Sequence, residues 1–241
     1  MKKDREEVIV HTMNLLQGRG PVYYAAFPFV PESSPRQGTK KEEAKHCLVS
    51  ALWEHLVARE GALGEELQCS KRTAFPLQIR SGLLGKPALL VGAYQGLAIS
   101  FSEGGGKIWA ALADDGSALG IDVAGPDEFQ STYPVHRVFH PEELRHALRS
   151  TKGNWEMASA LLWSVKEAVV KALGCAFHLV EPRQMTVSPA GDEETFIVRL
   201  SGKALNRFPL AAQEPLWVRS LAQEETWLSI ALFNRSLAGN A

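Results

Sequence analysis

The stretch LLWSVKEAVVKALG at residues 161–174 constrains the fold more than any other part of the chain, because it reads as a helix that is apolar on almost every face. Asn154 is a typical helix-start residue and Gly174 a typical stop, so the sequence predicts one long helix over residues 154–174. A helix that is apolar all round is expected to be buried in the core. It nevertheless carries Lys166, Glu167 and Lys171, although burying an unpaired charge costs several kcal/mol.

Two readings of these charges are open. Glu167 and Lys171 share one face of the helix, about 40° apart at roughly 100° per residue. In the first reading they form an exposed ion pair, worth about 0.2–0.5 kcal/mol. In the second reading they form a charged stripe that serves a metal ion or a phosphate, because the apolar neighbours leave little polar face to expose.

Asp122 raises the same question in the segment SALGIDVAG, which reads as a strand. Aspartate is disfavoured in strands, and Gly120 would permit another backbone to approach closely. Asp122 is either a strand-end residue that caps a turn near Pro126 or a carboxylate kept ionised by a divalent cation. In the second case Asp122 and Glu167 are two hard oxygen ligands of the kind Mg²⁺ takes, and Lys171 complements a polyphosphate beside them.

The order of elements is helix then strands, twice over. Residues 40–60 predict an amphipathic helix, and short apolar runs between 86 and 123 predict strands separated by Gly-rich or Asp-rich turns. HPEELRHAL (140–148) opens a further helix with Pro and acids at its start, and a second strand-rich block follows the long helix. The blocks LAISFSEGGGKIWAALA and VRSLAQEETWLSIALF have a similar shape. The sequence therefore predicts an α+β fold, a pseudo-dimer of two similar α+β halves: residues 1–115, residues 116–232 with the metal site, and a tail at 233–241.

Composition limits the functions to be considered. The net charge of −1 gives no reason to expect nucleic-acid binding, which favours a strongly basic surface. No apolar run approaches the roughly 18 residues of a membrane span, and the first residues resemble no signal peptide, so a cytoplasmic protein without membrane contact is expected. Cys47, Cys69 and Cys175 are widely spaced, so neither a zinc clip nor a disulfide framework is expected.

GID at 120–122 and WSVKEAVVK at 163–171 together resemble the paired signature of the 4′-phosphopantetheinyl transferase superfamily, in which (V/I)G(I/V)D is followed by (F/W)(S/C/T)xKE(A/S)xxK. GKP at 85–87 and SFS at 100–102 lie where the monomeric, Sfp-type branch has its GKP and SHS elements. The resemblance covers roughly residues 40–190 in motif order.

The resemblance implies a monomeric, Mg²⁺-dependent enzyme that binds coenzyme A and transfers 4′-phosphopantetheine to a serine of an acyl, peptidyl or polyketide carrier protein, releasing 3′,5′-ADP. Such carriers serve fatty acid, polyketide or nonribosomal peptide biosynthesis. Asp122 and Glu167 would hold the metal and act in catalysis with Lys171, and Glu167 or a metal-bound water would take the serine proton. The implied coenzyme A contacts are Lys45, His46, Lys86, Pro87, Ser100, Phe101, Ser102, Lys166 and Lys171.

Two departures from the family pattern leave alternatives open. Ala124 stands where many members have a second acid, so a water, Asp127 or Glu128 would have to replace it. Phe101 stands where the SHS element has a histidine that bonds a phosphate of coenzyme A. Either coenzyme A affinity is reduced or another donor takes over, from the set Ser100, Ser102, Lys45 and Arg72. The chain could therefore be a non-catalytic relative that binds coenzyme A or a carrier protein, or a different Mg²⁺-dependent phosphate-handling enzyme.

Overall fold

The computed structural model describes residues 8–15, 20–29, 37–59, 77–82, 85–91, 94–95, 97–113, 116–130, 134–177 and 179–234. Arg72, Cys69 and residues 235–241 of the predicted tail lie outside the described residues. Within the described part, no helix combines the length and the hydropathy needed to cross a membrane.

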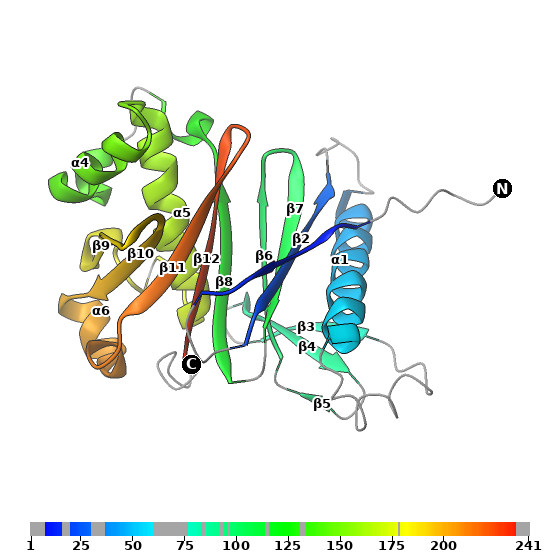
Figure 1. Ribbon diagram of the computed structural model, residues 1–241. Coiled ribbons are helices and arrows are strands. Elements are labelled where there is room, and N and C mark those ends of the chain that lie inside the picture. The colour runs from blue at the N-terminus through cyan, green and yellow to red at the C-terminus, as the bar shows by residue number, and fades with distance from the viewer. Residues whose placement is uncertain are drawn as a thin grey trace.

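The first half of the chain forms an antiparallel sheet with one long helix packed on it (Figure 1). The sheet order is β1-β2-β7-β6, and helix α1 contacts β2 and β7. Helix α1 buries Leu48, Leu52 and Leu56, the i, i+4, i+8 residues of one helical face. The bounds are β1 (Val10–Met13), β2 (Val22–Pro28), α1 (Gln37–Arg59), β6 (Ala98–Gly104) and β7 (Lys107–Ala113).

A small three-stranded sheet lies below the first one in Figure 1 and contacts it through β4 and β6. It consists of β3 (Leu77–Ser81), β4 (Pro87–Val91) and β5 (Tyr94–Gln95).

The second half is built around helix α5 (Trp155–Leu173), which packs on strands β8 and β12 of a five-stranded antiparallel sheet ordered β8-β12-β11-β10-β9. The predicted bounds of this helix are confirmed: the Asn154 side chain accepts a 2.8 Å hydrogen bond from the Met157 N–H, and Gly174 ends the helix at φ 73°. The strands are β8 (Ser117–Ala124), β9 (Met185–Ala190), β10 (Asp192–Leu200), β11 (Leu216–Gln223) and β12 (Thr226–Asn234).

Shorter elements complete the second half. They are the helices α3 (Val135–Val138), α4 (Pro141–Ser150) and α6 (Gly202–Arg207), and the 3₁₀ turns η2 (Pro126–Phe129), η3 (Pro182–Gln184) and η4 (Pro209–Ala212). Helix α4 begins at the predicted Pro141 and packs on α5.

The predicted mixed α+β class is confirmed, since each half packs one long helix against an antiparallel sheet. A third apolar cluster joins the two sheets, with Tyr24 and Trp109 from the first half and Ile121 and Ile230 from the second. The boundary near residue 115 agrees with the distribution of strands between the two large sheets and stays a prediction as a domain boundary. Strand β12 continues to Asn234 and buries Phe233, so the sheet extends two residues into the segment predicted as a tail.

Candidate functional site

Gly120 allows helix α5 to lie directly against strand β8. A Cβ atom at position 120 would stand 2.6 Å from the backbone nitrogen of Ala172 and would overlap the carbonyl oxygen of Ala168. No other residue fits there without moving the helix. The close backbone approach predicted at Gly120 is therefore confirmed, and it brings the last turns of α5 next to Asp122.

Asp122 and Lys171 form a short ion pair at this contact. Lys171 Nζ lies 2.7 Å from Asp122 Oδ1, and it also donates to the carbonyl oxygens of Ile121 at 3.1 Å and Phe101 at 3.3 Å. Asp122 is buried, so the ammonium group offsets the cost of removing the carboxylate from water. The alternative in which Asp122 caps a turn near Pro126 is wrong, because its carboxylate contacts Lys171 and Ser102 instead.

Glu167 is the second carboxylate of the site, with Oε2 3.9 Å from Lys171 Nζ. Burial and then the negative charge of Asp122 raise the pKa of Glu167 to about 7, against the lowering effect of Lys171. Glu128 in η2 adds a smaller upward contribution to the pKa of Glu167, so its charge also acts on the site. The reading of Glu167 and Lys171 as an exposed pair is wrong, because both side chains are more than two-thirds covered and the shortest contact of Lys171 is with Asp122.

These carboxylates fit a hard divalent cation in their chemistry. Two oxygen-donor groups have converged on Lys171, and burial together with the negative charge of Asp122 raises the pKa of Glu167. Within the described ranges no group of three His, Cys, Asp or Glu side chains is placed to hold an ion alone. Mg²⁺ often takes only one or two protein carboxylates and completes its shell with water and substrate phosphates, so Asp122 and Glu167 suffice for that mode of binding.

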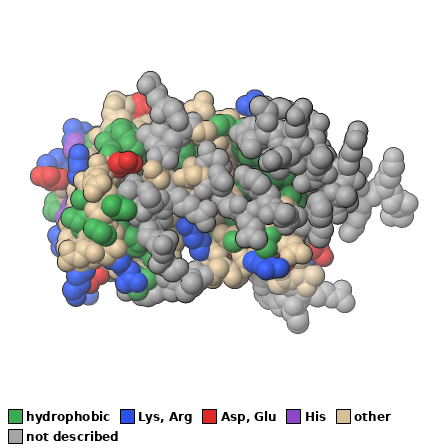
Figure 2. Space-filling model, turned by 90° about the horizontal axis from the view of Figure 1, so that it is seen from below, with side chains coloured by type: hydrophobic (Ala, Val, Ile, Leu, Met, Phe, Trp, Pro, Cys, Tyr) green, Lys and Arg blue, Asp and Glu red, His purple; other side chains and the backbone are tan. Residues whose placement is uncertain are grey.

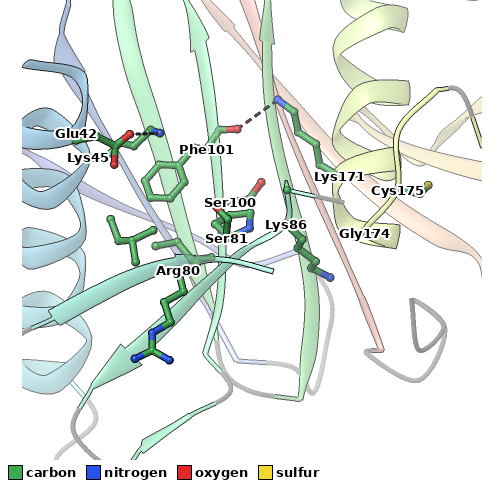
Figure 3. A pocket seen from close by; sticks show the side chains of 14 residues that line it. Glu42, Lys45, Arg80, Ser81, Lys86, Ser100, Phe101, Lys171, Gly174 and Cys175 are labelled. Atoms are coloured by element: carbon green, nitrogen blue, oxygen red, sulfur yellow. Dashed lines mark hydrogen bonds and ion pairs between the residues drawn. The ribbon is translucent and has the colours of Figure 1, made fainter. Parts of the chain in front are cut away.

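A cavity of about 300 Å³ lies beside Lys171, between the two halves and the small sheet (Figure 3). Its charged lining consists of Lys45 from α1, Arg80 from β3, Lys86 before β4, Lys171 from α5 and one acid, Glu42. In the view from below, Lys and Arg side chains of the described residues are visible near the middle of the face as well as at its left end (Figure 2). A cavity with four cations and one carboxylate favours an anionic ligand.

Most of the predicted coenzyme A contacts meet at this cavity, namely Lys45, Lys86, Pro87, Ser100, Phe101 and Lys171. Lys86 Nζ donates to the Ala172 carbonyl oxygen at 3.3 Å, near the end of α5. Lys45 pairs with Glu42 at 2.8 Å, and its ammonium group is 5.6 Å from the centre of the Phe101 ring. His46 is exposed on α1 and is not among the lining residues, and Ser102 lies behind the cavity against Asp122.

Lys166 requires a correction, because it was predicted to contact coenzyme A and does not line the cavity. Its side chain is completely buried, and its three hydrogens are used by Glu143 Oε2 at 2.9 Å, the Pro182 carbonyl oxygen at 2.9 Å and the Val138 carbonyl oxygen at 3.1 Å. Glu143 Oε1 in turn accepts from the Val187 N–H at 2.7 Å. Lys166 therefore ties α5 to α4 and to the segment before β9.

Sequence reasoning did not single out several of the lining residues, among them Arg80 and Cys175. Arg80 adds a cation from β3, and its only sequence signal is a basic residue shortly before the GKP element. Cys175 follows the end of α5, and burial raises the pKa of its thiol to about 11, which keeps the thiol protonated at neutral pH.

Fold and site together define an α+β protein with a carboxylate–lysine centre beside a cationic cavity, the kind of site that handles phosphorylated ligands. Residues 118–226 match the family model of the 4′-phosphopantetheinyl transferase superfamily (ACPS). The predicted resemblance to this superfamily is confirmed over that stretch, which contains Asp122, Glu167 and Lys171.

Similar solved structures span about half of this chain. An apo-ACPS structure from Chronobacterium ammoniagenes is 21% identical with a TM-score of 0.39, and covers 48% of this chain and 94% of that one. The ACPS–CoA complex of the same organism is 22% identical with a TM-score of 0.39, and covers 48% and 95%. The holo-ACP synthase of Plasmodium yoelii is 15% identical with a TM-score of 0.38, and covers 48% and 91%. No curated protein matches the sequence.

Proposed function

We propose that this chain is a monomeric, cytoplasmic, Sfp-type transferase that moves 4′-phosphopantetheine from coenzyme A to a serine of an acyl, peptidyl or polyketide carrier protein, in the presence of Mg²⁺. The single observation that carries the proposal is the meeting of Asp122, Glu167 and Lys171 beside a cationic cavity, within the stretch that matches the superfamily.

The cations of the cavity suit the two phosphate groups of coenzyme A, a pyrophosphate and a 3′-phosphate. Lys171 lies next to the carboxylates and Lys86 at the end of α5, so we assign these two to the pyrophosphate. Lys45, whose ammonium group lies 5.6 Å from the centre of the Phe101 ring, then remains for the 3′-phosphate on the side where Phe101 offers no hydrogen-bond donor. Arg80 also lines the cavity, with its side chain pointing away from Lys45 (Figure 3), and is the further cation available to that phosphate.

Asp122 and Glu167 would hold the Mg²⁺ ion, which when bound supplies positive charge to the pyrophosphate oxygens as the leaving group departs. Lys171 adds a second positive charge beside the same oxygens. Its ammonium group already has protein acceptors on two strands, so its position is set before any ligand arrives.

Glu167 is suited to accept the proton of the carrier serine. Its carboxylate lies 3.9 Å from Lys171, beside which this proposal places the pyrophosphate, so a proton acceptor stands at the reacting end of the ligand. In the proposed step the serine oxygen bonds to the β-phosphorus of coenzyme A and its proton passes to the Glu167 carboxylate. The bond from that phosphorus to the bridging oxygen breaks, and 3′,5′-ADP leaves with the electron pair.

A non-catalytic relative that binds coenzyme A or a carrier protein is the second candidate, and one observation favours it. Ala124 is fully buried in the apolar core and is paired in register with Trp227, so the position of the family's second acid is occupied by apolar packing. Phe101 likewise replaces a phosphate donor.

Intact-mass measurement separates the candidates. The chain is incubated with coenzyme A, Mg²⁺ and a panel of apo carrier proteins, and a carrier that gains one phosphopantetheine supports the transferase. Coenzyme A or carrier binding without any mass gain supports the non-catalytic relative. Glu167→Gln should remove the mass gain while the variant stays folded, and transfer by this variant at the wild-type rate would contradict the proposed site.

A further inference from the structure

Two serine hydroxyls join strand β6 of the first half to strand β8 of the second, although these strands belong to different sheets. Ser100 Oγ accepts from the Ile121 N–H at 3.1 Å, and Ser102 Oγ accepts from the Val123 N–H at 3.2 Å. Residues two apart on a strand face the same side, so both hydroxyls reach β8 while Phe101 faces the other way. The two N–H groups flank Asp122 in the chain.

Ser102 does more than Ser100 at this joint. Its hydroxyl also donates to Asp122 Oδ1 at 3.0 Å and accepts from Lys171 Nζ at 3.2 Å. Together with the Val123 N–H, this makes one donated and two accepted hydrogen bonds, which is the full capacity of a hydroxyl group. Ser102 is buried, so no water competes freely for these bonds.

We infer that Ser102 is a positioning residue that fixes the Asp122 carboxylate for a cation. Asp122 Oδ1 accepts hydrogen bonds from Ser102 and Lys171. Asp122 Oδ2 takes part in none of the hydrogen bonds of the described residues. The hydroxyl therefore determines which oxygen faces the ammonium group and which remains for a ligand. The expectation that a cation binds at Asp122 rests on the proposed function, whereas the hydrogen bonds of Ser102 are independent of it.

Loss of the hydroxyl has a definite consequence. Without the bond from Ser102, the Asp122 carboxylate is free to rotate and to turn both oxygens toward Lys171, which is only 2.7 Å away. Asp122 would then compete poorly for a cation, even though the ligand itself is unchanged. Removing a partner that orients a metal ligand typically weakens metal binding by about 10–100-fold.

The test compares Ser102→Ala with Ser100→Ala, which removes a backbone hydrogen bond of the same kind without touching a carboxylate. Binding of Mn²⁺ alone is measured by electron paramagnetic resonance of the free ion, and thermal unfolding is measured in parallel. We expect both variants to fold and Ser102→Ala to unfold at the lower temperature, because it loses three hydrogen bonds where Ser100→Ala loses one, so Mn²⁺ binding is compared at a temperature at which both are folded. Only Ser102→Ala should bind Mn²⁺ more weakly than wild type, by about tenfold or more.

Ser102→Thr and Ser102→Val provide a second pair if Ser102→Ala does not fold, because these variants are alike in shape and differ in the hydroxyl group. The threonine variant should keep Mn²⁺ affinity and the valine variant should lose it. Equal affinities in either pair, or a wild-type chain that takes up no Mn²⁺, would overturn the inference. If wild type still transfers phosphopantetheine in that case, only the inference fails; if wild type neither transfers nor binds coenzyme A, the proposed function fails as well.

Discussion

Gly120 lies against the carbonyl group of Ala168, so closely that a Cβ atom at position 120 would overlap the carbonyl oxygen. This contact sets the distance between β8 and α5 and thereby the distance between Asp122 on the strand and Lys171 on the helix. The absence of a side chain at position 120 thus determines the geometry of the charged centre.

Gly120→Ala should destabilise the protein by about 1–3 kcal/mol or more, because the added methyl group must displace α5. The measurement is urea unfolding, with the transfer assay alongside, and both stability and transfer should fall. Gly38→Ala is the matched control: no atom lies within 4 Å of its added Cβ and it is in the first turn of α1, so its stability should stay unchanged or rise by up to about 1 kcal/mol. Equal stability of the two variants would contradict the role given to Gly120.

Lys166→Met should destabilise the protein by about 3–5 kcal/mol, because it leaves the buried carboxylate of Glu143 without its cation. Lys166→Met combined with Glu143→Gln should recover part of that loss, since neither charge is then buried alone. A double-mutant cycle by urea unfolding measures the coupling. The exposed Lys203→Met serves as control, and a cycle without coupling would show that the pair does not stabilise the joint between α4 and α5.

Glu167 should make the metal-free protein less stable as the pH rises. Its pKa is about 7 in the folded chain, against an ordinary value of 4.5, so between these values the folded state holds more protons than the unfolded state. The resulting stabilisation is complete below about pH 4.5 and is lost as the pH rises through about 7. Glu167→Gln lacks this loss, so its stability relative to wild type should grow over that range in the presence of EDTA.

Urea unfolding at a series of pH values tests this dependence, with the exposed Glu193→Gln as control. Added Mg²⁺ should restore wild-type stability at high pH and leave Glu167→Gln little changed. A difference between wild type and Glu167→Gln that is flat across pH would argue against a raised pKa at position 167.

Phe101→His should tighten coenzyme A binding by about tenfold, because it adds one hydrogen bond to a charged phosphate. Isothermal titration with coenzyme A and with dephospho-coenzyme A isolates the effect, since only the first carries the 3′-phosphate. Phe101→Leu controls for loss of the ring beside Lys45. An unchanged affinity for coenzyme A would show that Lys45 and Arg80 already satisfy the phosphate.

The sequence predicted which charged residues come together at the site, and it did not predict the partner of the buried Lys166. Local patterns predicted the bounds of α5 and the close approach at Gly120. They also predicted the convergence of Asp122, Glu167 and Lys171, because an apolar helix with a charged stripe has few ways to be buried. The partner of Lys166 could not be predicted in this way. Glu143 reads as an ordinary acid at a helix start, and only the packing of α4 on α5 brings it to the lysine.

The role of Ser102 was equally hidden, because no sequence pattern reveals that β6 lies beside β8 across the joint of two sheets. Long-range topology, not residue type, turned a predicted coenzyme A contact into a partner of Asp122.

Glu128→Gln is expected to raise the Mg²⁺ concentration for half-maximal transfer by about tenfold. Ala124 cannot supply the family's second acid, and its place is filled by packing with Trp227, whereas Glu128 in η2 lies next to α5. Burial raises the pKa of Glu128, the Gly125 N–H opposes the shift, and the charge of Asp122 raises it further, which places this carboxyl group within electrostatic reach of the site. Asp127→Asn is the matched comparison, because Asp127 and Glu128 are neighbouring exposed acids of η2. A Mg²⁺ dependence that shifts in Asp127→Asn and not in Glu128→Gln would assign the supporting acid to position 127 instead.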